Sequence, residues 1–273
     1  MERCHKQIII ISIYFLLFIL LIVFLYFKFK TKETCFDGIK NQNEEEIDCG
    51  GACAKQCEKI TAQELIVEKT GTVFSGVAGK YDFYAQIANP NAVFGSKKFD
   101  YAINFKDSSG NILTSRNGSG FILPGERKYI VENGLDAPDS QISADFKIIN
   151  SEWVQLTEYY ERPDLKIINK NYSEISGGTD FAEARGLLKN NSPYDFETIK
   201  IQVILKDENG GILALNSTQM KTVKAGEERD FRAFWPSRFP GAASNMVVQA
   251  EVNVFDSDAF SKNFYPSYQF QQY

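Results

Sequence analysis

The C-terminal 200 residues of the chain repeat one pattern at a spacing of about 100 residues. Apolar and polar residues alternate over 99–105 and again over 199–205, at an offset of 100. Alternation with a period of two is typical of a strand that buries one face. Each run ends in Lys-Asp and is followed by a turn glycine, Gly110 in the first copy and Gly210 in the second. This pattern predicts a β-hairpin at the same place in two copies of one domain.

Further turn signals separate short alternating segments in both copies. Asparagine-rich segments lie at 89–91 and 190–193, and no long apolar stripe with helical period occurs in this part of the chain. Short strands with turn signals every 8–12 residues are typical of a β-sandwich. We therefore predict an all-β body of two tandem immunoglobulin-like β-sandwiches, over 65–160 and 165–273, joined by a short linker with Pro163.

The order of these signals resembles the FxLYD-type family of immunoglobulin-like β-sandwiches, in which a glycine and a Pro-Gly-Glu element form turns. The resemblance places these turns at Gly110 and 124–126 in the first copy, and at Gly210 and 226–227 in the second. The second copy departs from the family pattern, because Ala225 stands where the proline is expected. The resemblance implies a binding or spacer module of an envelope protein and supplies no catalytic residue, since fold alone does not fix function.

An uncharged apolar segment of 20 residues begins at Ile8 and ends at Phe27. As a helix it would be about 30 Å long, the thickness of a bilayer's hydrocarbon core. Buried core helices are rarely apolar on every face. A cleaved signal peptide has a shorter apolar region that ends at small residues, whereas Lys28 and Lys30 follow this one. We therefore predict an uncleaved transmembrane signal anchor over 8–27, with the lipid bilayer as partner and 1–7 as a cytoplasmic tail.

Four of the five cysteines cluster at Cys35, Cys49, Cys53 and Cys57. A segment as short as 35–57 cannot bury a core and needs covalent staples. Zinc sites favour C-x2-C pairs, and the spacing here is C-x13-C-x3-C-x3-C. We predict two disulfides with three possible connectivities, and keep zinc and free thiols as the alternatives. Disulfides require an oxidising compartment, so we expect the body to be extracytoplasmic, although the positive-inside count leans slightly the other way.

The segment 35–57 also resembles a short motif of prokaryotic surface proteins, C-x-D-G-x-x-N-x-x-E-x-x-x-D-C-G-G-x-C-x-x-C, with one extra residue before Cys57. The resemblance implies an extracytoplasmic protein and nothing about chemistry. The acids and amides of the segment are oxygen ligands suited to calcium, but the EF-hand spacing is absent and such residues also form turns. Both interpretations stay open for Asp37, Asn41, Asn43, Glu45 and Asp48.

The charge and motif content excludes several classes of function. The chain has 30 basic and 35 acidic residues, a net charge of −5, which argues against a nucleic-acid partner. His5 is the single histidine and precedes the apolar segment, so the body has no histidine for a catalytic triad or a metal site. The common nucleotide-binding, hydrolase and metalloprotease motifs are absent. We predict a protein that is not an enzyme and has no cofactor; a glycosidase-like pair of carboxylates is the enzymatic alternative.

The best candidate contact surface is the segment 231–241, which is rich in aromatic residues and arginine. Such residues are typical of protein interfaces, and aromatic faces also stack on sugars; the alternative is that they are core positions. The candidate contacts are Arg232, Phe234, Trp235, Arg238 and Phe239. We therefore predict a membrane-anchored cell-surface binding or spacer module with a surface-protein partner. The alternative is a carbohydrate- or cell-wall-binding module that uses the loop around Trp235.

Two further features have open interpretations. The aromatic tail over 264–273 is either a last strand or an exposed peptide that adds to the edge of another sheet. Glycosylation sequons begin at four asparagines, and they are either glycan sites or chance occurrences. The four are Asn117, Asn171, Asn190 and Asn216.

Overall fold

The computed structural model divides into two compact units, Met1–Thr61 and Ala62–Tyr273. The described residues cover most of the chain: 2–29, 34–45, 47–56, 61–137, 143–156, 160–177, 180–258 and 260. The predicted C-terminal tail over 264–273 lies outside them.

The first unit begins with the helix α1 (Glu2–Phe29), which contains the predicted anchor segment. Among the residues that the structure describes, no helix combines the length and the apolar character that crossing a bilayer requires. The side chains of 8–12 and of Phe27 lie outside the described part of α1. The transmembrane anchor therefore stays a prediction from the sequence.

The described part of the second unit contains twelve strands in four antiparallel three-stranded sheets, so the prediction of an all-β body is confirmed. The first repeat contains β1 (Ile66–Phe74), β2 (Lys80–Ala88), β3 (Phe94–Lys106), β4 (Ile112–Ile122), β5 (Arg127–Asp136) and β6 (Ser143–Gln155). The second repeat contains β7 (Leu165–Glu174), β8 (Ala182–Asn190), β9 (Phe196–Lys206), β10 (Ile212–Val223), β11 (Glu228–Trp235) and β12 (Asn245–Glu251), followed by the short helix η1 (Val254–Asp256).

The two repeats have the same topology. The sheet β1-β2-β5 of the first repeat corresponds to β7-β8-β11 of the second, and β4-β3-β6 corresponds to β10-β9-β12. The predicted hairpins join β3 to β4 and β9 to β10. In each turn the glycine N–H donates to the aspartate carbonyl, at 3.0 Å for Gly110 and 3.1 Å for Gly210. The duplicated sequence pattern thus folds into a duplicated pair of facing sheets.

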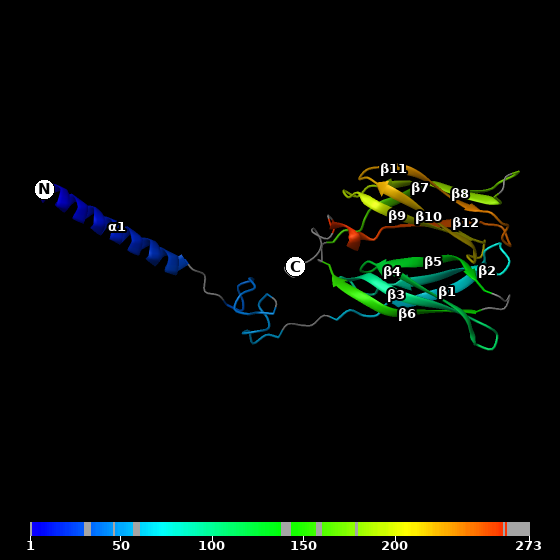
Figure 1. Cartoon of the computed structure of the whole chain (residues 1–273), viewed down its shortest axis with the longest axis horizontal. Helices are drawn as coiled ribbons and strands as arrows, with labels where there is room; N and C mark the ends of the chain where they lie inside the picture. The colour runs from blue at the N-terminus through cyan, green and yellow to red at the C-terminus, as the bar shows by residue number, and fades with distance from the viewer. Residues whose placement is uncertain are drawn as a thin grey trace. The chain divides into compact units, whose positions relative to one another are not determined.

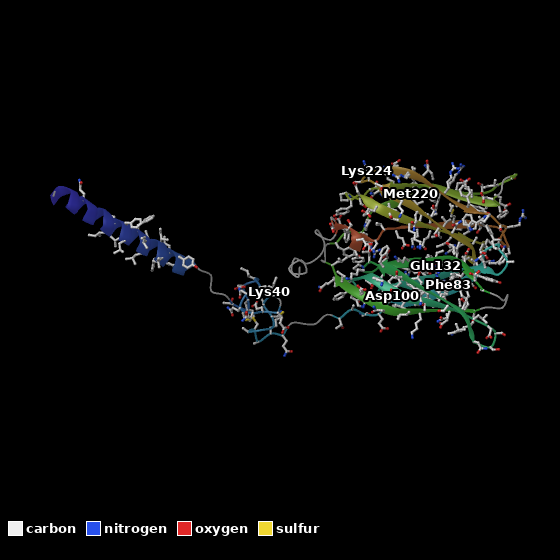
Figure 2. The ribbon with its side chains drawn as sticks, viewed as in Figure 1. Lys40, Phe83, Asp100, Glu132, Met220 and Lys224 are labelled. Carbon is white, nitrogen blue, oxygen red and sulfur yellow. A yellow bond between two sulfur atoms is a disulfide. The ribbon has the colours of Figure 1, made fainter. Side chains whose placement is uncertain are left out.

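The four sheets form successive layers, in the order β4-β3-β6, β1-β2-β5, β10-β9-β12 and β11-β8-β7 (Figure 1). Each repeat has its own core between its two sheets, and Phe83 lies fully buried in that of the first repeat (Figure 2). A third apolar cluster lies between the repeats and is centred on Val131, Ile204 and Leu215. The two middle layers are therefore covered on both faces.

Polar contacts fix the position of one repeat on the other. Lys128 Nζ of β5 lies 2.7 Å from Glu251 Oε2 of β12, and only 2% and 8% of these side chains are exposed. The same ammonium lies 3.7 Å from the centre of the Phe121 ring, and Gln202 donates to the other oxygen of Glu251. A buried ion pair of this kind depends on accurate geometry and on further hydrogen bonds. The contact between the repeats is therefore specific as well as apolar.

The asparagine-rich turns explain another repeated sequence signal. Asn190 is fully buried, and its Nδ2 donates to the carbonyl oxygens of Tyr194 and Lys224 at 2.8 and 3.0 Å. Asn89 ties the corresponding turns of the first repeat together in the same way. The carboxylate of Glu227 accepts the N–H of Lys224 at 2.7 Å and closes the Gly-Glu turn. The two turn signals of each repeat thus belong to one hydrogen-bonded unit.

Candidate binding surface

The strand β11 divides the predicted contact residues between two faces. Trp235 is 4% exposed, and its indole Nε1 donates to the carbonyl oxygen of Leu215 at 3.0 Å. Phe239 is likewise 4% exposed and lies with Trp235 in the core of the second repeat. The core interpretation is therefore confirmed for these two rings and the contact interpretation is wrong for them, because alternation along β11 turns Trp235 inward and Phe239 packs against it.

The other three predicted contact residues lie on the surface. Phe234 is 40% exposed, and Arg232 lies exposed on the same face of β11. Arg238 is also exposed, and its guanidinium lies 4.9 Å from the centre of the Phe181 ring. A cation over an aromatic face is held by the ring's quadrupole. The exposed candidates are therefore Arg232 and Phe234 on the outer face of β11 and Arg238 in the loop that follows the strand.

Register places further polar residues beside Arg232. Arg185 of β8 lies directly opposite Arg232, and Asn171 of β7 lies directly opposite Arg185. Directly opposed residues have Cβ atoms about 5 Å apart, so the three side chains form one row across the sheet. A pocket of about 370 Å³ opens over this row, with Asn169 and Asp230 on its lining. We call this pocket and its row the arginine face.

A bulge in β7 shapes the arginine face. The pairing of β7 with β8 shifts register between Ile168 and Asn171. Asn169 lies inside the bulge with φ of +52°, a left-handed conformation that asparagine adopts more readily than most residues. Gly186 lines the pocket beside it, where a Cβ would lie 2.7 Å from the ring of Phe231. Local backbone geometry thus makes a concave site in an otherwise regular sheet.

The arginine face carries two guanidinium groups and two nearby carboxylates, those of Glu183 and Asp230. Arg232 Nε lies 3.4 Å from Glu183 Oε1, in an ion pair whose arginine side chain is 62% exposed and whose glutamate side chain is only 15% exposed. Within the described residues, no comparable ion pair involves Arg185. Like charges directly opposite each other in a sheet destabilise it. The two guanidinium groups therefore favour a negatively charged group in the pocket.

Three residues of the arginine face were not predicted as contacts from the sequence, and Asn171 was considered only as a glycosylation sequon. The three are Asn169, Asn171 and Arg185. Buried and exposed residues alternate along β8, where Arg185 follows the buried Ala182 and Ala184. This alternation indicates that the Arg185 side chain points outward. The register that brings it to Arg232 is set by the pairing of β8 with β11, two strands that are not consecutive in the chain, and the sequence did not indicate that register.

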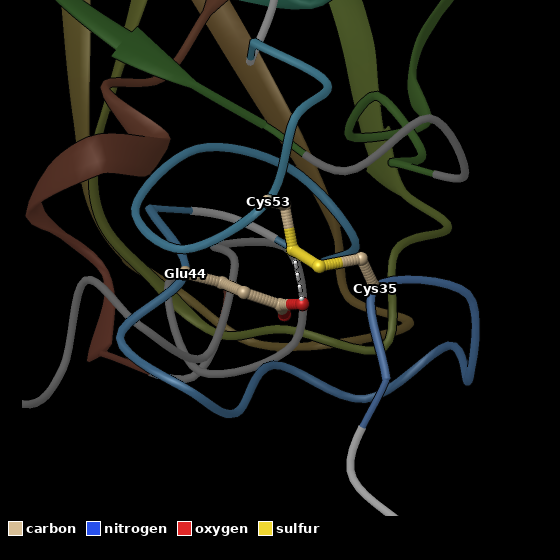
Figure 3. Close-up of side chains that lie close together, drawn as sticks. All are labelled: Cys35, Glu44 and Cys53. Carbon is tan, nitrogen blue, oxygen red and sulfur yellow. Dashed lines mark hydrogen bonds between the residues drawn. A yellow bond between two sulfur atoms is a disulfide. The ribbon is translucent and has the colours of Figure 1, made fainter.

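The cysteine module contains a disulfide between Cys35 and Cys53, with their Cα atoms 5.6 Å apart (Figure 3). Cys49 is also disulfide-bonded, and Cys57 lies outside the described residues. The zinc alternative is therefore wrong for Cys35 and Cys53. Glu44 Oε1 lies 3.0 Å from Cys53 Sγ, so a carboxyl group lies against the bonded sulfur.

Buried and backbone-bound carboxylates organise this module. Glu44 is 5% exposed, and its Oε2 accepts the N–H groups of Asn41 and Asp48, both at 3.2 Å. The carboxylate of Asp48 accepts the N–H of Asp37 at 3.0 Å. The backbone N–H of Thr34 and the side chain of Asn41 donate to Asp37 and lower the pKa of its carboxyl. These side chains therefore hold turns together.

The same hydrogen bonds bear on the calcium interpretation. The carboxylates of Asp37 and Asp48 face backbone donors, which occupies the oxygens that a cation would need. In the described part of the chain, the one group of three potential metal ligands is Cys35, Glu44 and Cys53, and its two sulfurs are bonded to each other. The described geometry thus favours the turn interpretation.

The sequons differ in accessibility. Asn117 and Asn171 lie exposed on β4 and β7. Asn190 is fully buried with both amide hydrogens donated, so this position has no room for a glycan. Asn216 is partly buried, and its amide donates to the carbonyl oxygen of Phe234 at 2.6 Å.

Acidic residues converge at a second pocket, of about 430 Å³, beside η1. Asp195 on its lining accepts the N–H of Ala225 at 2.8 Å, and Asp256 accepts from the amide of Asn253 at 2.8 Å. Both carboxylates therefore stabilise turns. Glu197 and Asp258 complete the acidic lining.

Comparison with known proteins found no family model that matches the chain. No curated protein matches it either. The two resemblances described above therefore rest on the residues themselves.

Proposed function

We propose that this chain is a membrane-anchored, extracytoplasmic binding module of the cell surface or envelope, without enzymatic activity. The apolar segment over 8–27 supports the anchor, and the disulfide between Cys35 and Cys53 supports an oxidising compartment. The order of turns supports immunoglobulin-like sandwiches of the FxLYD type. The protein would display the paired repeats outside the cytoplasm, with a short N-terminal tail inside.

The contact between the two repeats is the observation that favours a binding module over a spacer. A spacer gains length when its domains follow one another end to end. Here the sheets lie face to face, and the buried Lys128–Glu251 pair and the cluster around Val131 hold them there. The body therefore gains rigidity instead of length, which favours a binding module.

A thiol count on protein from native membranes tests the proposed compartment. The protein is denatured without reductant, alkylated with a heavy maleimide and weighed, and the procedure is repeated after reduction. We expect one reactive thiol before reduction, that of Cys4, and five afterwards. The matched variant Cys4→Ser should have none before reduction. Five reactive thiols at the outset would contradict an extracytoplasmic body.

A further inference from the structure

The two repeats use one pair of positions in opposite ways. Tyr84 lies opposite Val131 in β1-β2-β5, and Arg185 lies opposite Arg232 at an offset of 101 residues in the corresponding sheet. In the first repeat this pair packs against the second repeat, and Val131 is 2% exposed. In the second repeat the same face is the outermost layer, and it carries two guanidinium groups. The arginine face is thus the exposed counterpart of a packing surface.

The two guanidinium groups of the arginine face favour a ligand with a negatively charged group. The opposed guanidinium groups repel each other. Among the described residues, Glu183 forms an ion pair with Arg232 and not with Arg185. The planar fork of a guanidinium binds a carboxylate through two parallel hydrogen bonds. A carboxylate between Arg185 and Arg232 would relieve the repulsion and receive up to four such bonds.

The other groups of the arginine face select a polyhydroxylated ligand. The amides of Asn169 and Asn171 offer donors and acceptors, and Asp230 offers an acceptor for hydroxyl groups. Phe234, two residues from Arg232 on the same face of β11, is 40% exposed and offers a flat apolar surface for a sugar ring. An acidic peptide would supply carboxylates but few hydroxyl groups for the asparagines and Asp230 to bind.

We propose that the arginine face binds an acidic polysaccharide, with a uronate carboxylate between Arg185 and Arg232. The asparagines and Asp230 then bind sugar hydroxyls, and Phe234 packs against the neighbouring ring. This inference deepens the proposed function and rests on it for the location of the face outside the cytoplasm. It replaces the loop around Trp235 as the site of carbohydrate binding.

Calorimetric titration of the detergent-solubilised full chain tests the proposal. The probes are an oligogalacturonate, a neutral gluco-oligosaccharide of the same length, and a polyglutamate peptide of the same charge. We expect binding of the oligogalacturonate alone, weakened by salt. The double variant Arg185→Gln/Arg232→Gln should lose at least about tenfold in affinity, because two charge-assisted interactions are removed. Arg116→Gln, which removes an exposed arginine of β4, is the matched control and should bind normally.

Each contrary outcome overturns a definite part of the proposal. Absence of oligogalacturonate binding, or unchanged binding by the double variant, would overturn the site. Equal binding of polyglutamate would show an unspecific anion site. The double variant loses a repulsion but also the ion-pair partner of Glu183, so its thermal midpoint is measured beside the wild type's to show that it folds. Phe234→Ala provides a second variant that leaves the charges intact and should also weaken binding. The thiol count is independent of these results, so the compartment is judged separately.

Discussion

At the residue scale, the buried ion pair between the repeats gives a direct test of the interface. Glu251→Leu leaves the ammonium of Lys128 buried without its partner, which we expect to lower the free energy of unfolding by about 3–5 kcal/mol. The double variant Lys128→Met/Glu251→Leu should recover most of this loss, because no charge remains buried. Urea unfolding of the three proteins measures both effects. Equal stability of the single variant and the wild type would show that the pair is solvated.

Two glycines of the cysteine module form a matched pair. Gly51 has φ of +55°, and a Cβ there would lie 1.8 Å from the carbonyl oxygen of Asn43. Gly38 has φ of +71° and nothing within 4 Å of such a Cβ. We expect Gly51→Ala to prevent the Cys35–Cys53 disulfide from forming in oxidative refolding, as peptide mapping would show. Gly38→Ala should cost only the left-handed backbone, about 1–2 kcal/mol, and should still form the bond.

The buried carboxyl of Asp82 gives a prediction of pH dependence. Burial raises its pKa above the usual value of 3.8, although its Oδ1 accepts the N–H of Gly134 at 2.8 Å. The folded chain therefore holds this proton more tightly than the unfolded chain, and stability falls as the pH rises from the unfolded to the folded pKa. We expect Asp82→Asn to be more stable than the wild type at pH 7 and to lose that advantage in acid. Urea unfolding at both pH values measures this; an advantage that grows in acid would contradict it.

At the element scale, the tie between the asparagine-rich turn and the Gly-Glu turn should carry measurable stability. Asn190→Ala leaves the carbonyl oxygens of Tyr194 and Lys224 without their buried donor, which we expect to cost about 2–4 kcal/mol. Asn191→Ala removes only an exposed hydrogen bond to Asp164 and is the control. Thermal unfolding of both variants tests this, and similar midpoints would contradict it.

The elements that could be predicted from the sequence are those that local pattern determines. Alternation over 99–105 and 199–205 correctly predicts β3 and β9, and the Asp-to-Gly turns correctly predict their hairpins. The same alternation along β11 separates the buried Trp235 from the exposed Arg232, as the core interpretation of this segment expected. The burial of Gln202 and Ile204 could not be predicted, because the layer that covers their face of β9 belongs to the other repeat.

At the scale of the whole molecule, the contact between the repeats should couple their unfolding. Val131 is 2% exposed at the centre of this contact, and a lysine there would bury an unpaired charge. We expect one calorimetric transition for the wild type and two for Val131→Lys. Ile149→Lys changes a residue that is 60% exposed and should keep the single transition. A single transition in both variants would mean that the two repeats are not coupled through this contact.

The layered contact joins unlike faces, since β1-β2-β5 of one repeat meets β10-β9-β12 of the other. Such a head-to-tail arrangement does not close on itself, and each repeat keeps an unused copy of the face that the other employs. Stacking in this mode has no intrinsic end, and a further repeat would add onto β11-β8-β7. Arg185 and Arg232 stand there at the positions of Tyr84 and Val131, so the array carries a charged terminal cap, as solenoid proteins do at their ends.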